Sequence, residues 1–259
     1  MISVLHLGQI DYATALALQQ KLVVRRKAGE IGDVLLLLEH TPVITLGRNA
    51  KAANILASPE HLSAHGVELF ECDRGGDVTF HGPGQLVGYP IFDLREYATP
   101  DGKRKTLGAV DYVRRLEEVL IRTCASFHLP TGRISGLTGV WTQPLDAPQS
   151  KVAAIGVHIS RFVTSHGFAL NVNPDLSYFD LIIPCGITTH PVSSMAKELG
   201  RELDLNSVAE AVSRSFGQVF SSQMLWLESL DALAPTVGVP LQTPDNLRQL
   251  HGEDDIFLA

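Results

Sequence analysis

The sequence is poor in the residues that build disulfide frameworks and metal centres. Three of its 259 residues are cysteines, namely Cys72, Cys124 and Cys185, and no two of them form a CxxC pair. An odd number of widely spaced cysteines argues against both a disulfide framework and a thiolate metal site. The ten histidines show no HExxH or comparable ligand spacing. We therefore expect no metal ion and no cofactor, and each cysteine has to be interpreted separately.

Positive charge and long hydrophobic runs are also missing. The formal charge is −7 at pH 7 and the pI is near 5.8, so the chain lacks the dominant basic surface of a nucleic-acid-binding protein. Its longest aliphatic run, residues 34–38, is far shorter than the roughly 20 residues of a membrane span. Residues 1–20 do not show the order of a signal peptide. We expect a cytoplasmic protein with neither nucleic acid nor a membrane as partner.

The apolar content is sufficient for one buried core. Hydrophobic residues make up 45% of the chain, and no repeat or low-complexity tract divides it. We predict a single catalytic domain over residues 1–259, with its core at about 1–220. Residues 221–259 mix prolines with a polar end, which indicates a C-terminal appendage of uncertain order.

Hydrophobic periodicity changes repeatedly between the helical and the strand pattern. The predicted helices cover residues 12–28, a short segment that follows 58–60, 106–128, 193–200 and 206–221. The predicted strands cover residues 2–7, 33–39, 43–47, 67–72, 77–81, 85–94, 139–142, 151–159 and 165–173. Several strands follow one another through short turns, which favours antiparallel pairs. The expected fold is α/β (α+β), with a mixed, largely antiparallel central sheet flanked by helices.

The three cysteines differ in their surroundings. Cys124 falls on the apolar stripe of the predicted helix 106–128, so we expect it to serve packing. Cys72 ends a predicted strand, which also favours a structural role. Cys185 ends an apolar run and stands between a proline and a glycine. That setting is typical of an activated thiol and indicates an enzyme that forms a thioester.

Lys151 begins a hydrophobic strand. Alternation places it on one face with Ala153, Ile155, Val157 and Ile159, and places Val152, Ala154, Gly156 and His158 on the other. A lysine on an apolar face loses hydration of its charged form unless an anion, such as a thiolate, lies nearby. The alternative is a lysine whose stem packs while its amine stays in water.

The next strand carries Gly167 and Ala169 on one face. If Ala154–Gly156 pairs with Gly167–Ala169, small residues face small residues. Such a surface leaves room for a slim ligand such as an extended acyl chain. Burial of its roughly seven methylenes would contribute about 5–6 kcal/mol. Close packing of a helix on the sheet is the alternative explanation.

Residues 74–85, Arg-Gly-Gly-Asp-Val-Thr-Phe-His-Gly-Pro-Gly-Gln, hold four glycines and a proline. This composition predicts a loop that approaches a ligand closely. The segment is not a P-loop, because no Lys-Ser/Thr follows Gly84 and Pro83 has no amide donor. Taken alone, His81 is more often a structural histidine and Arg74 more often an ion-pair partner.

Four segments together resemble the signature of the lipoyl(octanoyl) transferases, enzymes of lipoate biosynthesis. They are residues 74–85, 151–157, 166–173 and 183–187, and the resemblance covers about residues 1–220. It implies the α/β fold of biotin and lipoate protein ligases. It also implies octanoyl transfer from octanoyl-acyl carrier protein to a lysine of lipoyl domains. The implied acceptors are the 2-oxoacid dehydrogenase complexes and the glycine cleavage H protein.

Carried over residue by residue, the resemblance places the acyl-thioester nucleophile at Cys185. It makes Lys151 the residue that lowers the pKa of this thiol and acts as acid and base. The substrate-binding residues that it implies are Arg74, Gly75, Gly76, Asp77, Val78, Thr79, Phe80, His81, Ala154, Ile155, Gly156, Gly167, Phe168 and Ala169.

The sequence says less about the entrance of this site, its oxyanion donors and its docking surface. Asp77 stands where the family often has glutamine, and residues 157–159 vary the strand. Oxyanion donors are expected among backbone amides near Gly186 or among the glycines of the 74–84 loop. Docking of an acidic carrier protein on an acidic chain requires a local basic patch. Candidate patches are residues 103–105 and 25–27, although a solvated surface run also explains each.

Three other functions fit parts of the pattern. An ATP-dependent lipoate or biotin ligase also uses a lysine, but it adenylates the acid and needs no thiol, so Cys185 weighs against it. A Cys-dependent thioester hydrolase would pair Cys185 with His81, His166 or His190. A lipoyl-domain binder without activity would leave the pair of Cys185 and Lys151 unexplained.

Overall fold

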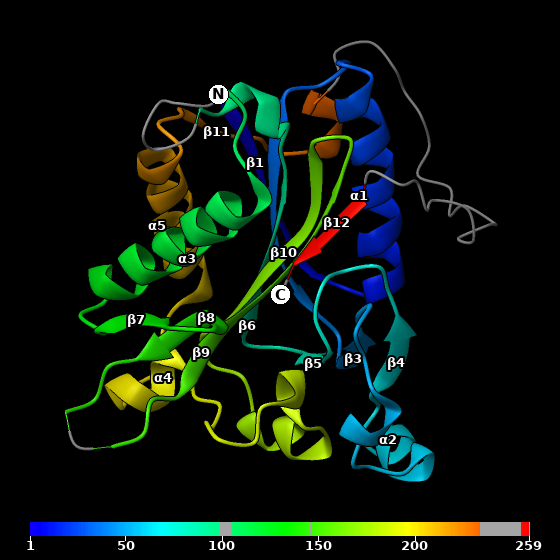
Figure 1. Cartoon of the computed structure of the whole chain (residues 1–259), viewed down its shortest axis with the longest axis vertical. Helices are drawn as coiled ribbons and strands as arrows, with labels where there is room; N and C mark the ends of the chain where they lie inside the picture. Colours follow the sequence, from blue (N-terminus) through cyan, green and yellow to red (C-terminus); the bar gives the residue numbers. More distant parts are fainter. Residues whose placement is uncertain (99–104, 146, 234–254, 259) are drawn as a thin grey trace.

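A mixed sheet forms the centre of the computed structural model, which describes residues 1–98, 105–145, 147–233 and 255–258 (Figure 1). The strand order is β11-β1-β2-β6-β10-β9-β8-β7, and β12 pairs with β9. β1 is parallel to both β2 and β11, and the other neighbours are antiparallel. The strands are β1 (Ile2–Ile10), β2 (Asp33–His40), β6 (Gln85–Ile91), β7 (Thr131–Ile134), β8 (Leu137–Thr142), β9 (Lys151–Ser160), β10 (Val163–Asn171), β11 (Met224–Trp226) and β12 (Asp255–Leu258).

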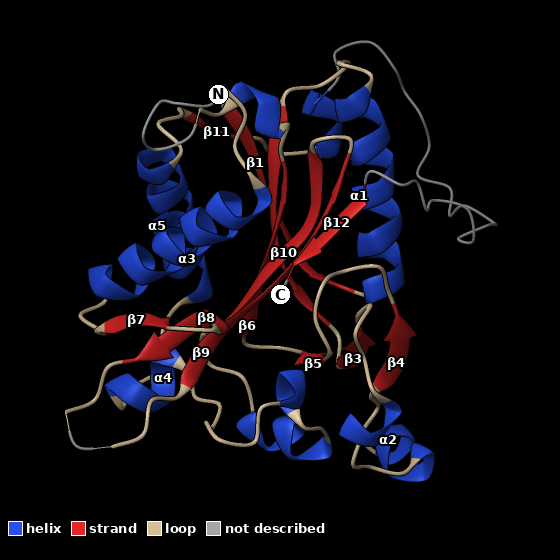
Figure 2. Cartoon of the chain, viewed as in Figure 1, coloured by secondary structure: helices blue, strands red, loops and turns tan. Residues whose placement is uncertain are grey.

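A second, smaller sheet has the order β4-β3-β5. It consists of β3 (Val43–Leu46), β4 (Glu68–Glu71) and β5 (Val78–His81). The central strand β3 is parallel to β4 and antiparallel to β5. Because β5 leads through a short turn into β6 of the large sheet, this small sheet carries the glycine-rich segment to the large one (Figure 2).

Helices cover both faces of the large sheet, with α3 and α5 on one side and α1 on the other (Figure 1). The α-helices are α1 (Tyr12–Lys27), α2 (Pro59–Ala64), α3 (Ala109–Ser126), α4 (Met195–Leu199) and α5 (Leu205–Val219). Short 3-10 helices are η1 (Ala52–Asn54), η2 (Leu94–Glu96), η3 (Leu176–Leu181), η4 (Pro184–Gly186) and η5 (Leu230–Leu233). None of the helices in the described ranges is long and apolar enough to cross a bilayer.

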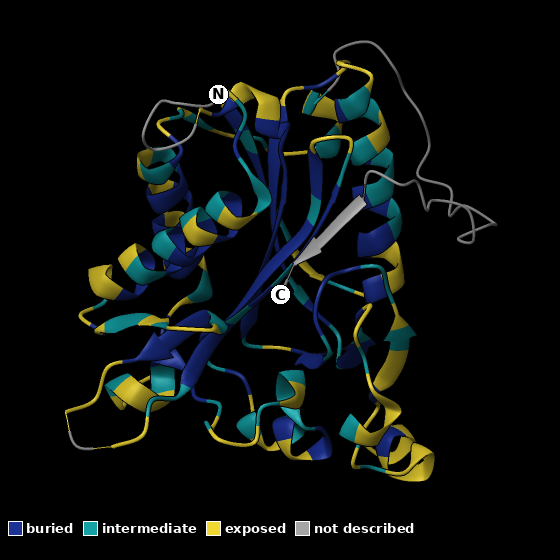
Figure 3. Cartoon of the chain, in the orientation of Figure 1, coloured by how far each residue is buried: buried dark blue, intermediate teal, exposed yellow. Residues whose placement is uncertain are grey.

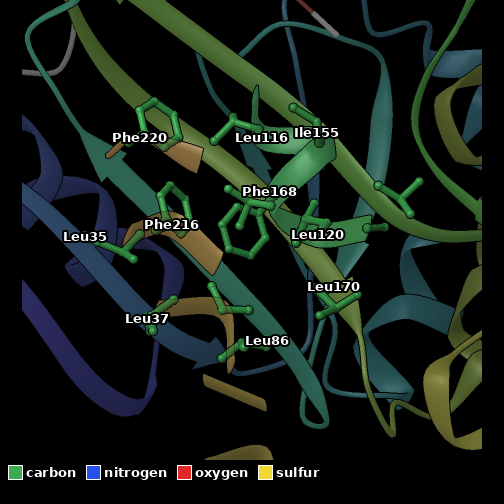
Figure 4. Close-up of a cluster of buried hydrophobic side chains, with 14 of the residues drawn as sticks. Leu35, Leu37, Leu86, Leu116, Leu120, Ile155, Phe168, Leu170, Phe216 and Phe220 are labelled. Carbon is green, nitrogen blue, oxygen red and sulfur yellow. The ribbon is translucent and has the colours of Figure 1, made fainter. Parts of the chain in front are cut away.

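The main core lies between the large sheet and helices α3 and α5. Alternate residues of β10, Phe168 and Leu170, point toward Leu116 and Leu120 of α3 and toward Phe216 of α5 (Figure 4). On the opposite face, α1 packs on β1, β2, β6 and β10. Burial follows the same division, since the central strands are buried and the helices are buried along one side (Figure 3). β10 therefore packs against helices on both faces of the sheet, and β9 packs on α3.

Helix starts agree with the sequence because side-chain caps define them. Asp11 precedes α1 and accepts a hydrogen bond from the Thr14 amide at 2.8 Å. Ser58 caps α2 in the same way, with Pro59 at its first position. A capping oxygen satisfies an amide that has no partner inside the helix. The predicted helices 12–28, 106–128 and 206–221 are confirmed to within three residues at each end.

One predicted strand is corrected, because β6 ends at Ile91 rather than at residue 94, where the chain turns into η2 with Asp93 as its cap. β7 was not predicted, and it forms a hairpin with β8. Within the segment 221–259, β11 joins the edge of the sheet beside β1, and β12 pairs with β9. Residues 234–254 and 259 lie outside the described residues.

Candidate active site

Two cavities meet at Cys185. Both are lined by Thr79, Ala154, Ala169 and Cys185. The larger one, which we call the long cleft, encloses about 450 Å³ including its open mouth and is also lined by Tyr12, Arg74, Gly75, Gly76, His81, Val87, Tyr89, Ile155, Gly156, His166, Gly167 and Phe168. The smaller one, the lysine cavity, encloses about 270 Å³ and is also lined by Gln85, Lys151, Asn171, Phe179, Pro184 and Val192.

Cys185 occupies a left-handed backbone conformation in η4. Its φ of 54° and ψ of 20° are uncommon for a residue with a side chain. Gly186 follows at φ 65°, and a Cβ atom there would lie 3.1 Å from Asp77 Oδ2. The Ile183 amide donates to the Asn54 carbonyl at 2.7 Å, which fixes the start of the turn. The turn therefore presents a partly buried thiol on a strained backbone, as functional sites often do.

Lys151 faces this thiol. Its ammonium donates to Cys185 Sγ at 3.6 Å and lies 4.8 Å from the centre of the Trp141 ring. The lysine is 7% exposed, so its predicted inward position is confirmed and the alternative of an amine in water is wrong. A buried ammonium needs a compensating partner, and an aromatic face with a thiolate supplies one. Such an ammonium in turn stabilises the thiolate, which is the nucleophilic form of cysteine.

The prediction that Lys151 shares a strand face with Ala153 and Ile155 is wrong. Lys151 lines the lysine cavity together with Ala154, whereas Ala153 and Ile155 pack in the core under α3. The cause is a register shift between β8 and β9: Val140 pairs with Ala153, but Trp141 pairs with Lys151. One extra residue in β9 forms a bulge, which reverses the alternation at the start of the strand.

The predicted pairing of β9 with β10 is confirmed. Gly167 pairs with Gly156, and Ala169 pairs with Ala154. The two glycines admit neighbouring backbone, because a Cβ on Gly156 would lie 2.7 Å from the Gly75 carbonyl oxygen and one on Gly167 would lie 2.2 Å from that of Gly88. Their small size thus serves the approach of the glycine-rich loop and of β6. The pair of Ala154 and Ala169 therefore forms the floor of the long cleft beside Cys185.

Arg74 holds the glycine-rich loop over this floor. It is buried, and its five hydrogen bonds all go to neutral oxygens, namely those of Thr45, Gly75 and Asp77. The expectation that Arg74 forms an ion pair is therefore wrong. The Gly75 amide donates to the Val157 carbonyl at 3.1 Å, which attaches the loop to β9.

The residues of the loop divide between the cleft and the protein interior. Arg74, Gly75, Gly76, Thr79 and His81 line the long cleft. Val78 and Phe80 do not, because alternation along β5 turns them into a separate small core, where Phe80 stacks on Tyr178. Asp77 also lies away from the cleft. Its carboxylate accepts hydrogen bonds from the Asn54 side chain at 2.5 Å and the Lys51 amide at 3.0 Å, and it braces the turn that carries Cys185.

A chain of side-chain hydrogen bonds runs beneath the lysine cavity. His81 Nδ1 donates to Gln85 at 2.7 Å, Gln85 donates to Asn171 at 2.9 Å, and Asn171 donates to the Ser193 carbonyl at 3.0 Å. Burial lowers the pKa of His81 well below its ordinary value, so this imidazole is neutral. His81 is thus a hydrogen-bonded histidine, as predicted, that also borders the cleft.

Several lining residues were not predicted. Gln85 ends the segment 74–85 and Asn171 lies within the segment 166–173, so their motif position was an available signal. Tyr12, Tyr89 and His166 reach the long cleft from α1, β6 and β10. Only the packing of these elements brings them together, and periodicity does not reveal it.

The histidines of the hydrolase alternative have other partners. Across the described part of the chain, the hydrogen bond to Cys185 Sγ comes from Lys151 and none comes from a histidine. His166 bonds to Asp73 at 2.7 Å, and His190 bonds to the Thr189 hydroxyl at 2.8 Å. The pairing of cysteine and histidine that a thioester hydrolase would require is not formed.

The structure also bears on the expected oxyanion donors and on the expected basic patches. The amides of Gly75, Gly84 and Gly186 already donate within the protein, to Val157, Glu39 and Ile183, so these expected oxyanion donors are engaged. Residues 25–27 do not form a solvated basic run, because Arg26 is buried against Asp33 at 2.8 Å. In the other candidate patch, residues 103 and 104 lie outside the described residues.

Comparison with known proteins gives a consistent result. The family model of the lipoyl protein ligase A/B catalytic domain matches residues 11–217. A protein named octanoyltransferase from Koribacter versatilis is 61% identical over the full length of both chains. A second octanoyltransferase, from Acidobacterium capsulatum, is 55% identical and covers 94% of this chain and 100% of its own.

Among solved structures, the bipartite lipoate protein ligase of Thermoplasma acidophilum superposes with a TM-score of 0.65 at 15% identity, covering 90% of each chain. At this identity the likeness concerns the fold, and it confirms the predicted ligase-like α/β architecture. With the family model matching most of its length, the chain belongs to the lipoyl protein ligase A/B catalytic-domain family, as the four sequence segments predicted.

Proposed function

We propose that this protein is an octanoyltransferase that carries the acyl group as a thioester on Cys185. The observation that carries the proposal is the contact of 3.6 Å between the Lys151 ammonium and Cys185 Sγ at the junction of two cavities. The 61% identity to an octanoyltransferase over the full chain supports the same activity.

In the first step, the Cys185 thiolate attacks the carbonyl carbon of octanoyl-acyl carrier protein. A carbon–sulfur bond forms on the enzyme, and the bond to the carrier breaks. The carrier thiolate leaves with a proton from the Lys151 ammonium, which becomes a neutral amine. Splitting acyl transfer in this way replaces one difficult step with two easier ones.

In the second step, the amine of the acceptor lysine attacks the acyl-enzyme. Its nitrogen bonds to the carbonyl carbon while Cys185 leaves as a thiolate. Neutral Lys151 accepts the proton that the attacking nitrogen loses, so the starting ion pair is restored. Because both cavities are lined by Cys185, donor and acceptor can reach the same sulfur from different sides.

The long cleft suits the hydrocarbon part of the substrate. Its floor beside Cys185 consists of Ala154 and Ala169, and Arg74 to Gly76 cover it from above. Burial of about seven methylenes would contribute roughly 5–6 kcal/mol of binding free energy. The lysine cavity has Gln85 and Asn171 beside Lys151, and these polar side chains suit the entry of an amine.

The acceptor proposed for this chain is a lipoyl domain. A fold neighbour, the archaeal ligase from Thermoplasma acidophilum, is described with its E2 lipoyl domain, which supports this class of acceptor. Lipoyl domains of 2-oxoacid dehydrogenase complexes and the glycine cleavage H protein are the proposed members, with octanoyl-acyl carrier protein as donor.

The test is incubation of the purified protein with octanoyl-acyl carrier protein in the absence of ATP, followed by intact-mass measurement. We expect one added octanoyl group that hydroxylamine removes, and no such adduct on Cys185→Ala. Addition of a lipoyl domain should then move the group to its lysine as an amide. Formation of the amide only when octanoate and ATP are supplied would identify a ligase instead, and release of free octanoate would identify a hydrolase.

A further inference from the structure

His166 and Tyr89 both contribute a ring to the long cleft, and of the β10 residues that line it, His166 lies farthest along the strand from Ala169. Both line the cleft, and their centres lie 6.4 Å apart at an angle of 85°. Ala169, which borders both cavities beside Cys185, lies three residues after His166 along β10. At about 3.3 Å per strand residue, His166 stands roughly 10 Å from that alanine.

Both rings are fixed from behind by side chains that do not line the cleft. His166 Nε2 donates to Asp73 at 2.7 Å, and the other carboxylate oxygen of Asp73 accepts from His158 Nδ1 at 2.7 Å. The Tyr89 hydroxyl bonds to His40 Nε2 at 2.7 Å. Burial opposes the charge on Asp73, yet the two histidine hydrogen bonds outweigh it and hold its pKa well below the usual range. The carboxylate that anchors His166 is therefore ionised, which strengthens the hydrogen bond.

The backbone of His166 is also held in place. Its φ of 55° lies in the left-handed region, although it is part of a strand and is not glycine. Its amide donates to the Gln19 side chain of α1 at 2.8 Å. A residue persists in such a conformation only when its surroundings determine it firmly. Side chain and backbone thus fix the ring of His166 at 2% exposure.

We propose that His166 and Tyr89 form the end wall of the acyl cleft and limit the bound chain to about eight carbons. This inference rests on the proposed octanoyltransferase function and adds its chain-length specificity. An extended octanoyl chain, with carbon–carbon bonds of about 1.5 Å, spans roughly 9 Å. That length matches the roughly 10 Å along β10 between Ala169, which lines both cavities with Cys185, and His166. Each methylene fewer should weaken acylation roughly fourfold, because less apolar surface is buried.

Longer chains meet a wall that does not yield easily. To pass His166, a chain would have to displace a ring bonded to an ionised carboxylate and leave Asp73 with one partner instead of two. The loss of a hydrogen bond to this partly buried carboxylate is costly. We expect the wild-type protein to acylate Cys185 with a dodecanoyl carrier at least tenfold more slowly than with an octanoyl carrier.

The experiment compares this ratio of dodecanoyl to octanoyl acylation rates, measured by intact mass, between two variants. His166→Gly removes the ring, and glycine suits the left-handed backbone. His158→Ala is the matched control, because it also removes one hydrogen bond to Asp73 but does not line the cleft. We expect the ratio to rise tenfold or more in the first variant and to stay unchanged in the second. His166→Asn, which is smaller and tolerates the same backbone, should shift the ratio in the same direction by less.

The outcomes distinguish a failure of the end wall from a failure of the proposed function. An unchanged ratio in both His166 variants overturns the end wall while the octanoyl adduct still supports the proposed function. An equal rise in His158→Ala also overturns it, because general loosening would then explain the change. Absence of any adduct on the wild-type protein overturns the proposed function itself, and the end wall with it.

Discussion

Helix α3 and the turn η4 each carry a cysteine, and the two sites are opposite in nearly every physical respect. Cys124 of α3 is completely buried in the main core, where burial raises the pKa of its thiol to about 12. Cys185 of η4 is partly exposed, occupies a left-handed backbone and lies 3.6 Å from the Lys151 ammonium.

The difference shows that surroundings, not residue type, determine the chemistry of a thiol. In α3 the regular helix places a small thiol against Leu and Phe side chains, and burial outweighs the hydrogen bond with Thr131 in its effect on the thiol pKa. In η4 the thiol lines two cavities and lies beside an ammonium. One chain therefore holds two cysteines in opposite environments, one of them the proposed nucleophile.

The largest effect expected from this contrast is in thiol alkylation. At pH 8 only about one Cys124 in 10⁴ carries a thiolate, given its pKa of about 12, and it is also shielded from reagent. Iodoacetamide should therefore modify Cys185 at least roughly 10³-fold faster than Cys124 in the folded protein. Peptide mass spectrometry over a time course measures both rates.

Unfolding supplies the control for this measurement. In concentrated guanidinium chloride the two cysteines should react at similar rates, because the differences in burial and partner are gone. Comparable rates in the folded protein would remove the physical distinction between the two regions.

The next largest effect concerns Lys151. Lys151→Met keeps a stem of similar size but removes the ammonium, so octanoyl transfer should fall by about 10²–10³-fold. Alkylation of Cys185 should also slow, because the ammonium beside its sulfur is gone. Lys197→Met, at an exposed position of α4, is the control and should change neither rate. Faster alkylation of Cys124 in the Lys151 variant would instead indicate a disturbed fold.

Sequence reasoning succeeded where one element determines the answer. The stripe that buries Cys124 is a property of α3 alone, and the period of its apolar residues predicts it. Cys185 was recognisable from its flanking proline and glycine, and the resemblance of four segments gave its role. The pairing of β9 with β10 followed from small residues in two adjacent strands.

Prediction from the sequence failed where two elements that are distant in the chain contact each other. The bulge that turns Lys151 toward the lysine cavity arises from pairing with β8. The partners of Arg74 include Thr45 on β3, and His166 is fixed by Asp73, which lies 93 positions away. Gly156 looked like part of a ligand bed, but the Gly75 carbonyl occupies the space above it. None of these contacts leaves a periodic trace in the sequence.

The two regions should also differ in their effect on stability in acid, which is the smallest of the expected effects. Burial lowers the pKa of His40, behind the cleft, to about 4, whereas the unfolded chain has an ordinary value near 6.5. Between these values the unfolded state binds more protons, so the stabilising contribution is complete above pH 6.5 and is lost as pH falls toward 4. The loss from this group is on the order of 1–3 kcal/mol.

Urea unfolding followed by circular dichroism at pH 7, 6, 5 and 4.5 measures this slope. In His40→Gln the loss of unfolding free energy should become shallower but should not vanish, because burial also lowers the pKa of His81 and His166. His128→Asn is the control from the other region, since this exposed residue at the end of α3 has a left-handed backbone that asparagine tolerates. Its slope should equal that of the wild type. Equal slopes in all three proteins would mean that the buried histidines behind the cleft do not set the acid limit, and the contrast between a titrating cleft and an inert core would fail.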